Sequence, residues 1–515
     1  MATLHAISAL DIVFCLALAL AIPFFSLAAY RAWLSPLSRF PGPTLAKASF
    51  WYEFYYDWFK PGMYHQKIQE MHRRYGPVVQ ITPDEIHISD AAYFNKVFVT
   101  AGTRKTDMYV GPFRGTPFED YIEILRKHET HRLLRMPIQN SFSRGSVRSN
   151  EPHVVETVRM LASRLAEYKD TGRPVDMSNV LLSFAVDSVS ASMCERPTRY
   201  LEDPEFNAVW FKSQKHGMTW LPLLAMLPRT MRRFIMRLLN FISSVTPSTK
   251  AYIPRKNTAY RAGFREALQP SPVVKFGSTE RTVGLKKRFG DDIYDLGGQL
   301  LQQAGVNPMS SCLQTILTHL ALNPAMRQKL RSELQSLLPG SPTTTTSGVS
   351  WQQLEQLTYL DACIKEGLRL GGGNMHRTAR VFPETDLVVE GWTIPRGTAV
   401  AMTPYFMHMD EEAFPRPEKF DPERWLQGDG DGNGGANAKR MMADYLVPFG
   451  KGSRDCLGRY QAQMTMCYLL NELYKPGAPE LDLYETDETD VALVHGYMFP
   501  LPKLDSRGVR VLVRS

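Results

Sequence analysis

Cysteine is scarce in this chain of 515 residues, which contains only six. They are Cys15, Cys194, Cys312, Cys363, Cys456 and Cys467, and no two of them form a C-x-x-C pair. Such a sparse set excludes a disulfide scaffold, and the missing pairs argue against a zinc finger or a thioredoxin-like site. Any chemistry that a cysteine performs in this protein must therefore involve a single thiol.

Several other familiar signatures are also missing. There is no dense Lys/Arg run, although 60 Lys and Arg outnumber 52 Asp and Glu, so nucleic acid is not an expected partner. No G-x-G-x-x-G stands between a predicted strand and a predicted helix, which leaves no candidate nicotinamide or flavin domain. Hydrophobic residues make up 44% and charged residues 22%, a balance that indicates a large buried core rather than a disordered chain.

The long hydrophobic run lies at the N-terminus, where residues 12–30 carry no formal charge. As a helix this run is about 30 Å long, enough to cross a bilayer core. Basic residues follow the run and none precedes it, so the positive-inside rule places the bulk of the chain in the cytosol. We expect a membrane anchor over residues 1–34, with its transmembrane helix at about 12–30, and one domain over 35–515. A cleaved signal peptide is the alternative, with Ser26–Ala28 as a small-x-small site.

Hydrophobic patterning predicts a large helical body with small peripheral sheets. Residues 75–90 alternate apolar and polar around a Pro-Asp turn, which indicates a strand hairpin, and strand-like runs return at 381–400 and near the C-terminus. Residues 151–338 have mostly helical spacing, and 291–323 predict one long helix. The glycine-rich segment 428–437 is expected to be a surface loop.

One cysteine stands in a distinctive setting, because residues 448–458 read PFGKGSRDCLG. Gly450 and Gly452 allow tight backbone turns and the close approach of a flat ligand. The helical pattern that starts at Leu457 places Cys456 at a helix N-terminus, where a thiolate is stabilised, and Arg454 adds positive charge. A thiolate in this position can serve as a nucleophile or as a soft metal ligand.

Phe449, Gly452, Arg454, Cys456 and Gly458 together resemble the haem-binding loop of the cytochrome P450 family. The resemblance implies that Cys456 is the axial ligand of a haem b iron. It also implies that the flanking loop residues contact the cofactor, namely Phe449, Gly450, Arg454 and Gly458.

Two upstream segments resemble further motifs of the family. Glu366 and Arg369, three apart on one helical face, match its E-x-x-R, and the segment 420–425 supplies Arg424. The resemblance implies that these three side chains form a buried ion-pair triad with a structural role. An ordinary surface pair is the alternative for Glu366 and Arg369 taken alone.

Three further side chains are expected at the haem propionates. His131 and Arg135 stand where the family has W-x-x-x-R, and Arg380 matches the arginine that reaches a propionate. Arginine–carboxylate pairs can be bidentate and strong. Arg377 and Arg380 could instead be solvated loop residues.

The pattern departs from the family in the predicted helix 291–323. The usual acid and alcohol that deliver protons to bound oxygen are here Asn307 and Pro308. Asn307 can orient water but cannot act as a general acid, and Ser310 or Ser311 could hold a water. Asn307 and Ser310 are therefore the candidate catalytic residues. We expect Pro308 to bend the helix.

The resemblance covers nearly all of residues 35–515 and implies the mostly α (α+β) cytochrome P450 fold. It also implies a haem-thiolate monooxygenase that hydroxylates or epoxidises a lipophilic small molecule. The overall pattern is similar to fungal members of the trichodiene-oxygenase type, which act on terpenoids and related secondary metabolites. Because of Asn307 and Pro308, an oxygen-independent isomerase or dehydratase and a haem-binding protein without turnover remain open alternatives.

The same resemblance implies the partners and the location of the protein. Electrons are expected from NADPH through NADPH-cytochrome P450 reductase, and cytochrome b5 is a candidate second partner. Basic side chains near the thiolate, at Lys451, Arg454 and Arg459, could steer an acidic reductase face. The expected location is the endoplasmic reticulum membrane, with a single pass and a cytosolic catalytic domain.

Overall fold

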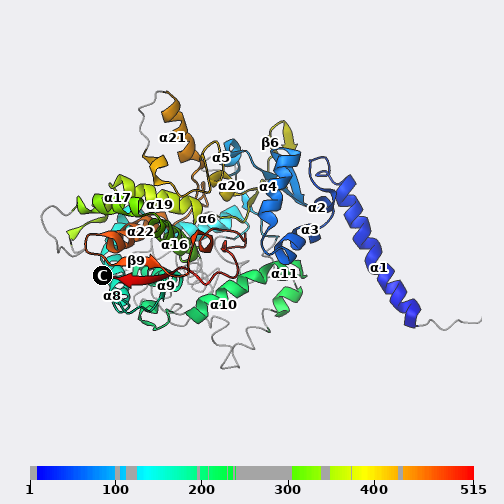
Figure 1. The fold of residues 1–515 in the computed structure, drawn as a ribbon. Helices are drawn as coiled ribbons and strands as arrows, with labels where there is room; N and C mark the ends of the chain where they lie inside the picture. Colours follow the sequence, from blue (N-terminus) through cyan, green and yellow to red (C-terminus); the bar gives the residue numbers. More distant parts are fainter. Residues whose placement is uncertain are drawn as a thin grey trace, which may run out of the picture.

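The computed structural model describes residues 9–98, 105–111, 124–193, 198–206, 208–228, 230–235, 238, 304–337, 348–372, 374–426 and 433–515. Within these residues the fold is mostly helical with three small sheets (Figure 1). The predicted mostly α fold is thereby confirmed. Outside them lie the first part of the predicted loop 428–437 and the first part of the predicted helix 291–323.

The N-terminal helix α1 (Ala9–Ala29) projects away from the body and continues as a π-helix, η1 (Tyr30–Leu34) (Figure 1). Together, α1 and η1 contain the one candidate membrane span among the described helices, Ala17–Leu34, judged by length and composition. Most of their large side chains are exposed, among them Phe14, Ile22, Phe25 and Trp33. The predicted apolar helix is therefore present.

The main helical layer surrounds α16 (Asn307–Leu322). It includes α8 (Glu151–Ala166), α9 (Met177–Met193), α17 (Pro324–Gln335), α19 (Thr358–Leu370) and α22 (Arg459–Tyr474). In α16 the buried Met309, Leu313, Ile316 and Leu320 recur at helical spacing and pack into the largest hydrophobic core. This layer forms the floor and one wall of the site described below.

A glycine allows α19 to lie close against α16. A Cβ at Gly367 would lie 2.4 Å from Cγ1 of Ile316, so a larger residue would force the two helices apart. Gly371 has the same function one turn later, because its Cβ would lie 2.4 Å from Oγ1 of Thr315. The end of α19, and the segment that follows it, are thereby held against α16.

Small sheets lie beside the helical layer. The largest has the order β1-β2-β8-β5-β3, with β1 (Val78–Thr82), β2 (Glu85–Ile88), β3 (Asp107–Met108), β5 (Thr378–Val381) and β8 (Ala399–Met402). A second sheet joins β4 (Val175–Asp176), β10 (Arg510–Arg514) and β9 (Glu480–Leu483), and a hairpin joins β6 (Leu387–Val389) and β7 (Trp392–Ile394). Val78 pairs with Ile88 in antiparallel register, which confirms the predicted hairpin.

Shorter helices connect these layers. They are α2 (Thr44–Ala48), α3 (Trp51–Phe54), η2 (Tyr55–Phe59), α4 (Tyr64–Tyr75), η3 (Ala91–Tyr93), α5 (Phe94–Val97), α6 (His128–Gln139), η6 (Asn140–Phe142), α7 (Arg144–Ser149), η7 (Tyr200–Glu202), α10 (Ala208–Thr219), α11 (Leu221–Met226), α18 (Trp351–Leu354), α20 (Pro404–His408), η10 (Pro422–Trp425), α21 (Asn433–Tyr445) and η12 (Glu488–Asp490). Of these, α3, η2, α6 and η10 carry side chains that matter for function.

Two details differ from the sequence-based expectations. The segment 433–437, predicted as part of a loop, begins helix α21, because alanine, lysine and arginine after Asn433 favour a helix more than the glycines disfavour it. Pro308 does not bend the described helix: α16 starts at Asn307, after a turn at Gly305 and Val306, and Pro308 occupies its first turn. Proline is well tolerated there, since no backbone N–H is required of it.

Candidate active site

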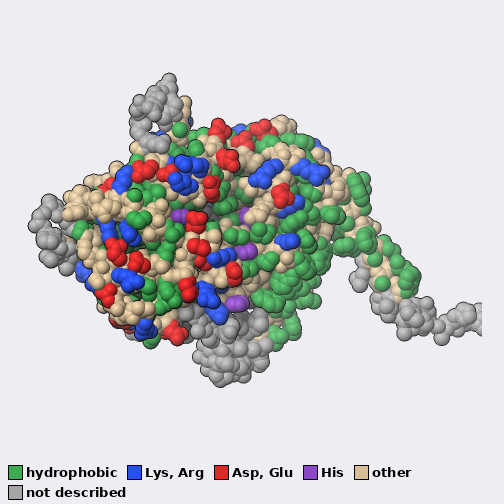
Figure 2. Space-filling model, viewed as in Figure 1, with side chains coloured by type: hydrophobic (Ala, Val, Ile, Leu, Met, Phe, Trp, Pro, Cys, Tyr) green, Lys and Arg blue, Asp and Glu red, His purple; other side chains and the backbone are tan. Residues whose placement is uncertain are grey.

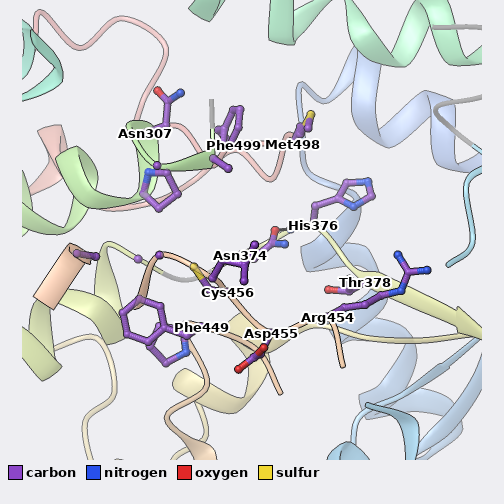
Figure 3. Close-up of a pocket in the computed structure, with 18 of the residues that line it drawn as sticks. Asn307, Asn374, His376, Thr378, Phe449, Arg454, Asp455, Cys456, Met498 and Phe499 are labelled. Carbon is purple, nitrogen blue, oxygen red and sulfur yellow. Dashed lines mark hydrogen bonds between the residues drawn. The ribbon is translucent and has the colours of Figure 1, made fainter. Parts of the chain in front are cut away.

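A cavity of about 480 Å³ lies between the start of α16, the segment that joins α19 to β5, and the loop that precedes α22. Figure 3 shows Asn307 and Phe499 on one side of it and Cys456 and Phe449 on the other. The chain turn at Met498–Pro500 closes a further wall. Segments that are hundreds of residues apart in the sequence therefore meet around one thiol.

The thiol belongs to Cys456, on a loop that turns through two glycines. Gly450 and Gly452 have φ of +64° and +86°, a region that favours glycine. The backbone N–H of Cys456 donates to the carbonyl of Phe449 at 2.8 Å, which closes the loop three residues before α22 begins. Phe449 and Gly458 line the cavity with Cys456, whereas Gly450 shapes the turn behind it.

Other cysteines in the described chain are in different surroundings. Cys312, Cys363 and Cys467 are buried, and burial raises the pKa of each thiol, so these three stay neutral. Cys15 lies exposed on α1, and Cys194 falls outside the residues that the structure describes. Cys456 alone of the described cysteines lines the cavity, so it is the cysteine available to a ligand there.

The cavity is lined by four potential cations that the sequence analysis had singled out: His131 and Arg135 from α6, Arg380 from β5, and Arg454 from the thiol loop. Arg135 donates from Nη1 to the carbonyl of Asp455 at 2.6 Å and also pairs with the Asp455 carboxylate. Among the described residues, Arg380 donates to the thioether sulfur of Met108, a weak acceptor, at 2.7 Å and to the carbonyl of Ala379 at 3.5 Å. The sequence-based candidates are thus brought together at one wall.

Arg454 is the least satisfied of these cations. Its Nη2 donates to the carbonyl of Arg126 at 3.2 Å, but its Nε and Nη1 are buried with no hydrogen-bond partner in the described part of the chain. Burial lowers the pKa of Arg454 to about 10. Burial, and then the positive charge of Arg454, lower the pKa of Arg380 to about 9. Both shifts arise first from burial of the guanidinium groups, which disfavours their charged form.

His131 is held neutral in the same group. It is 5% exposed, and burial, followed by the charges of Arg454 and Arg135, lowers its pKa to about 3. A neutral imidazole keeps one N–H donor. It can therefore donate a hydrogen bond to an anion without adding a further charge.

The three side chains of the expected triad are in contact and buried behind the cavity. Glu366 accepts from Nη2 of Arg369 at 2.7 Å and from Nε of Arg424 at 3.0 Å. Nε1 of Trp425 donates to the other Glu366 oxygen at 3.0 Å, and Nη1 of Arg369 donates to the carbonyls of His408 and Pro417. Glu366 and Arg369 are fully buried, so this is not a surface pair.

The start of α16 separates the two serines that could hold a water. Asn307 and Ser311 line the cavity, together with Pro308 and Met309. Ser310 is fully buried and does not line it; its Oγ accepts from Nε2 of Gln314 at 2.9 Å. The structure therefore offers Asn307 and Ser311, rather than Ser310, to a molecule in the cavity.

Sequence reasoning missed a second group of polar residues at the cavity. Asn374, His376 and Thr378 follow α19 and line the wall beside Cys456 (Figure 3), and Glu85 reaches the cavity from β2. The glycines after α19 were the available signal, because they let the following segment pass close to α16. Glu85 gave no such signal, since a single acid in a predicted hairpin has no distinctive spacing.

The basic residues expected at the reductase surface are not equivalent. The buried nitrogens of Arg454 and its place in the cavity wall make it a site residue, so it is not a surface charge. Arg459 pairs with Asp455 at 3.1 Å, and Nζ of Lys451 donates to the carbonyl of Asp444 at 3.3 Å. Lys451 is therefore the least neutralised of the three.

Comparisons with known proteins support a single family. The family model for Cytochrome P450 matches residues 42–474. The chain is 34% identical to cytochrome P450 monooxygenase oblB of Aspergillus clavatus, over 95% of each chain. It is 33% identical to stellatic acid synthase of Emericella variicolor, over 94% of this chain and 92% of that one, and 31% identical to fusicoccadiene C-8 hydroxylase of Phomopsis amygdali, over 94% and 93%.

Proposed function

The chain belongs to the cytochrome P450 family and is a P450 monooxygenase; on this basis we propose that it inserts one oxygen atom of O₂ into a terpenoid or related lipophilic secondary metabolite. The observation that carries this proposal is the meeting of Cys456 with the cations of α6, β5 and the thiol loop around one cavity. The reaction expected is hydroxylation or epoxidation, with electrons from NADPH through NADPH-cytochrome P450 reductase. Cytochrome b5 is a second proposed donor.

Membership of the family implies a haem cofactor, and the cavity residues fit one. The buried, unpaired Nε and Nη1 of Arg454 need acceptors, which two propionate carboxylates supply. We assign Arg380, Arg454 and the neutral His131 as propionate donors, with Arg135 holding the thiol loop through Asp455. Cys456 is the proposed axial ligand, supported by Phe449, Gly450 and Gly458. The bound haem would supply oxygen activation, which a thiolate ligand favours.

The residues around the cavity have distinct tasks in this reaction. Apolar side chains such as Met309, Met498 and Phe499 bind a lipophilic substrate and exclude water from the reacting carbon. Asn307 holds a water through its amide, and the Ser311 hydroxyl is placed at the same wall to pass a proton. Ser310 supports this end of α16 through its hydrogen bond with Gln314.

One relative directs attention to the substrate class. The name of fusicoccadiene C-8 hydroxylase describes hydroxylation of fusicoccadiene at C-8, and that protein is 31% identical to this chain over most of both lengths. The wall made by Met309, Met498 and Phe499 is compatible with such a molecule. We therefore propose a terpenoid with a carbon skeleton of similar size.

A second candidate function is an oxygen-independent isomerase or dehydratase reaction. It is favoured by the replacement of the usual acid and alcohol by Asn307 and Pro308 at the cavity wall. Asn307 cannot deliver a proton as a carboxylic acid does. In this alternative the cavity would accept a substrate that is already a peroxide or an alcohol.

Product analysis under ¹⁸O₂ separates the candidates. The reductase-coupled, full-length protein should form a product with one ¹⁸O atom per turnover, in strict dependence on NADPH. An unlabelled, rearranged product formed without NADPH would favour the isomerase or dehydratase. Absence of any product from terpenoid substrates, with haem bound, would leave a haem-binding protein without turnover.

The same chain is proposed to be anchored in the endoplasmic reticulum membrane, through residues 1–34, with the domain 35–515 in the cytosol. The projecting helix α1 supports this arrangement. Figure 2 shows hydrophobic side chains gathered where α1 joins the body and over α3 and α11. Exposed apolar residues of that region include Trp33, Leu45, Trp51, Phe59 and Trp220. Such a surface fits contact with a lipid interface, from which a lipophilic substrate can enter.

A further inference from the structure

A second cavity, of about 430 Å³, adjoins the first and contains an unusual group of charges. Tyr109, His376, Arg377 and Met498 line both cavities, whereas Cys456 lines only the first. The second cavity is therefore a continuation of the site away from the thiol. Its other walls are largely apolar, with Phe50, Phe54, Leu221, Pro222 and Met226.

Four charged side chains meet at the junction, and we call them the acidic cluster: Glu53, Asp57, Glu85 and Arg377. Arg377 donates from Nε to Glu85 at 2.8 Å and from Nη2 to Glu53 at 2.8 Å. Glu85 lines the first cavity, and Glu53 and Asp57 line the second. Arg377 thus pairs with Glu53 and Glu85, and the charges of Glu53 and Arg377 also act on Asp57. The acidic cluster therefore has more hydrogen-bond acceptors than cations.

One atom of the acidic cluster is left without a partner. Glu85 is 1% exposed, and its Oε2 is buried with no hydrogen bond to any described residue. A buried acceptor without a hydrogen bond destabilises a protein unless a ligand or a water donates to it. Because Oε1 of the same carboxyl is fixed by Arg377, a donor that reaches Oε2 would meet a group already held in position.

The charges around this atom restrict the complementary group. A carboxylate on the ligand would find no free cation, since Arg377 already pairs with Glu53 and Glu85, and an ammonium would have to lie beside the guanidinium of Arg377. Burial raises the pKa of Glu85 to about 7. Burial, together with the charge of Glu53, raises the pKa of Asp57 to about 8. Both shifts favour the protonated form of these carboxyls, so the acidic cluster offers a donor as well as acceptors, which suits an uncharged hydroxyl.

We propose that the acidic cluster recognises a hydroxyl group on the substrate, at the end distant from the carbon that is oxidised. This inference rests on the proposed function, since it names the substrate of that site more closely. The substrate is then a terpenoid alcohol and not a bare hydrocarbon. A reaction that installs a hydroxyl, an earlier hydroxylation or a cyclisation that ends by capturing water, must supply it.

The test compares two probes that differ in one group. Geranylgeraniol and the C20 hydrocarbon in which hydrogen replaces its hydroxyl are titrated into the full-length, haem-loaded protein, with binding followed by tryptophan fluorescence. A hydrogen bond to a buried ionisable group predicts that the alcohol binds about tenfold or more tightly than the hydrocarbon. Equal affinities, or no binding of either probe, would overturn the inference.

Near-isosteric variants locate the recognition. Glu85→Gln can keep a carbonyl for Arg377 while it replaces the Oε2 acceptor by an amide donor, and Asp57→Asn removes the other carboxyl with a raised pKa. Each should reduce the preference for the alcohol to about threefold or less without weakening hydrocarbon binding. Should Glu85→Gln fail to fold, the alcohol preference of Asp57→Asn still tests the proposal. A preference that stays at tenfold in the folded variants would contradict the proposal.

Asp84→Asn is the matched control. Asp84 lines the second cavity but accepts from the hydroxyl of Tyr109 at 3.0 Å and lies outside the acidic cluster. The same acid-to-amide change there should leave the alcohol preference unaltered, and an equal loss would overturn the assignment. The reduced-CO spectrum of each preparation reports separately on the haem thiolate, so a failure of the proposed function is distinguishable from a failure of hydroxyl recognition.

Discussion

Arg454 has fewer hydrogen-bond partners among the described residues than Arg135 or Arg377 has. Arg135 is neutralised by Asp455, and Arg377 by Glu53 and Glu85, whereas Nε and Nη1 of Arg454 are buried without a partner among the described residues. A buried, unpaired guanidinium destabilises a chain that lacks its anion. We therefore regard Arg454 as a residue whose conformation is completed by the cofactor.

Replacing this arginine should have opposite effects on the empty and the loaded protein. Arg454→Met removes an unsatisfied buried charge, so the apoprotein should be as stable as the wild type or more stable. The haem-loaded protein should lose about 1–3 kcal/mol of cofactor binding, seen as faster haem transfer to an acceptor protein. Thermal unfolding of both forms and the haem-transfer rate are the measurements. Equal destabilisation of both forms would show that Arg454 has only a structural role.

At the scale of elements, the contacts of α19 determine how firmly the thiol loop is supported. Its residue Glu366 accepts from Arg424 and Trp425 of η10. Arg369 donates to Glu366 and to the carbonyls of His408 and Pro417. The three-residue spacing of Glu366 and Arg369 was sufficient to predict the pair. The carbonyl partners were not predictable, because they come from the last residue of α20 and from the chain beyond it, 39 and 48 residues after Arg369.

Arg369→Ala should therefore leave the buried Glu366 with one fewer cation and cost about 3–5 kcal/mol of unfolding free energy. We expect little haem incorporation, measured as the reduced-CO band per mole of protein. Lys365→Ala on the same helix is the control: Lys365 pairs with Asp361 at 2.6 Å, but both side chains are exposed, so the loss should be about 0–1 kcal/mol. An undiminished CO band in Arg369→Ala would contradict the account.

The whole molecule shows which features a sequence can indicate. Local patterns were sufficient for the thiol loop, the hairpin 78–88 and the apolar helix α1, since each depends on neighbouring residues. The acidic cluster depends on side chains from α3, η2, β2 and the residue before β5, which only the fold brings together. The orientation of Ser310 away from the cavity also could not be read from helical spacing, because it depends on where α16 begins.

Removal of residues 1–34 should separate anchoring from folding. The truncated protein should keep the thiolate-type CO band and should bind neutral lipid vesicles about tenfold more weakly, through the exposed Trp51 and Phe59. Adding Trp51→Ser and Phe59→Ser should abolish the remaining binding in a vesicle flotation assay. Leu322→Ser, at an exposed apolar position at the end of α16, should leave vesicle binding unchanged. Full vesicle binding by the truncated chain would argue against α1 as the anchor.

The central claim, that Cys456 holds a haem iron as a thiolate, is tested most directly by the reduced-CO spectrum of two single variants. Cys456→Ser should lose the thiolate-type band, whereas Cys467→Ser, which changes a buried thiol in the adjoining helix α22, should keep it. Both proteins should be compared with the wild type at equal haem content. A thiolate-type band that survives in Cys456→Ser, or that is absent from the haem-loaded wild type, would contradict the account.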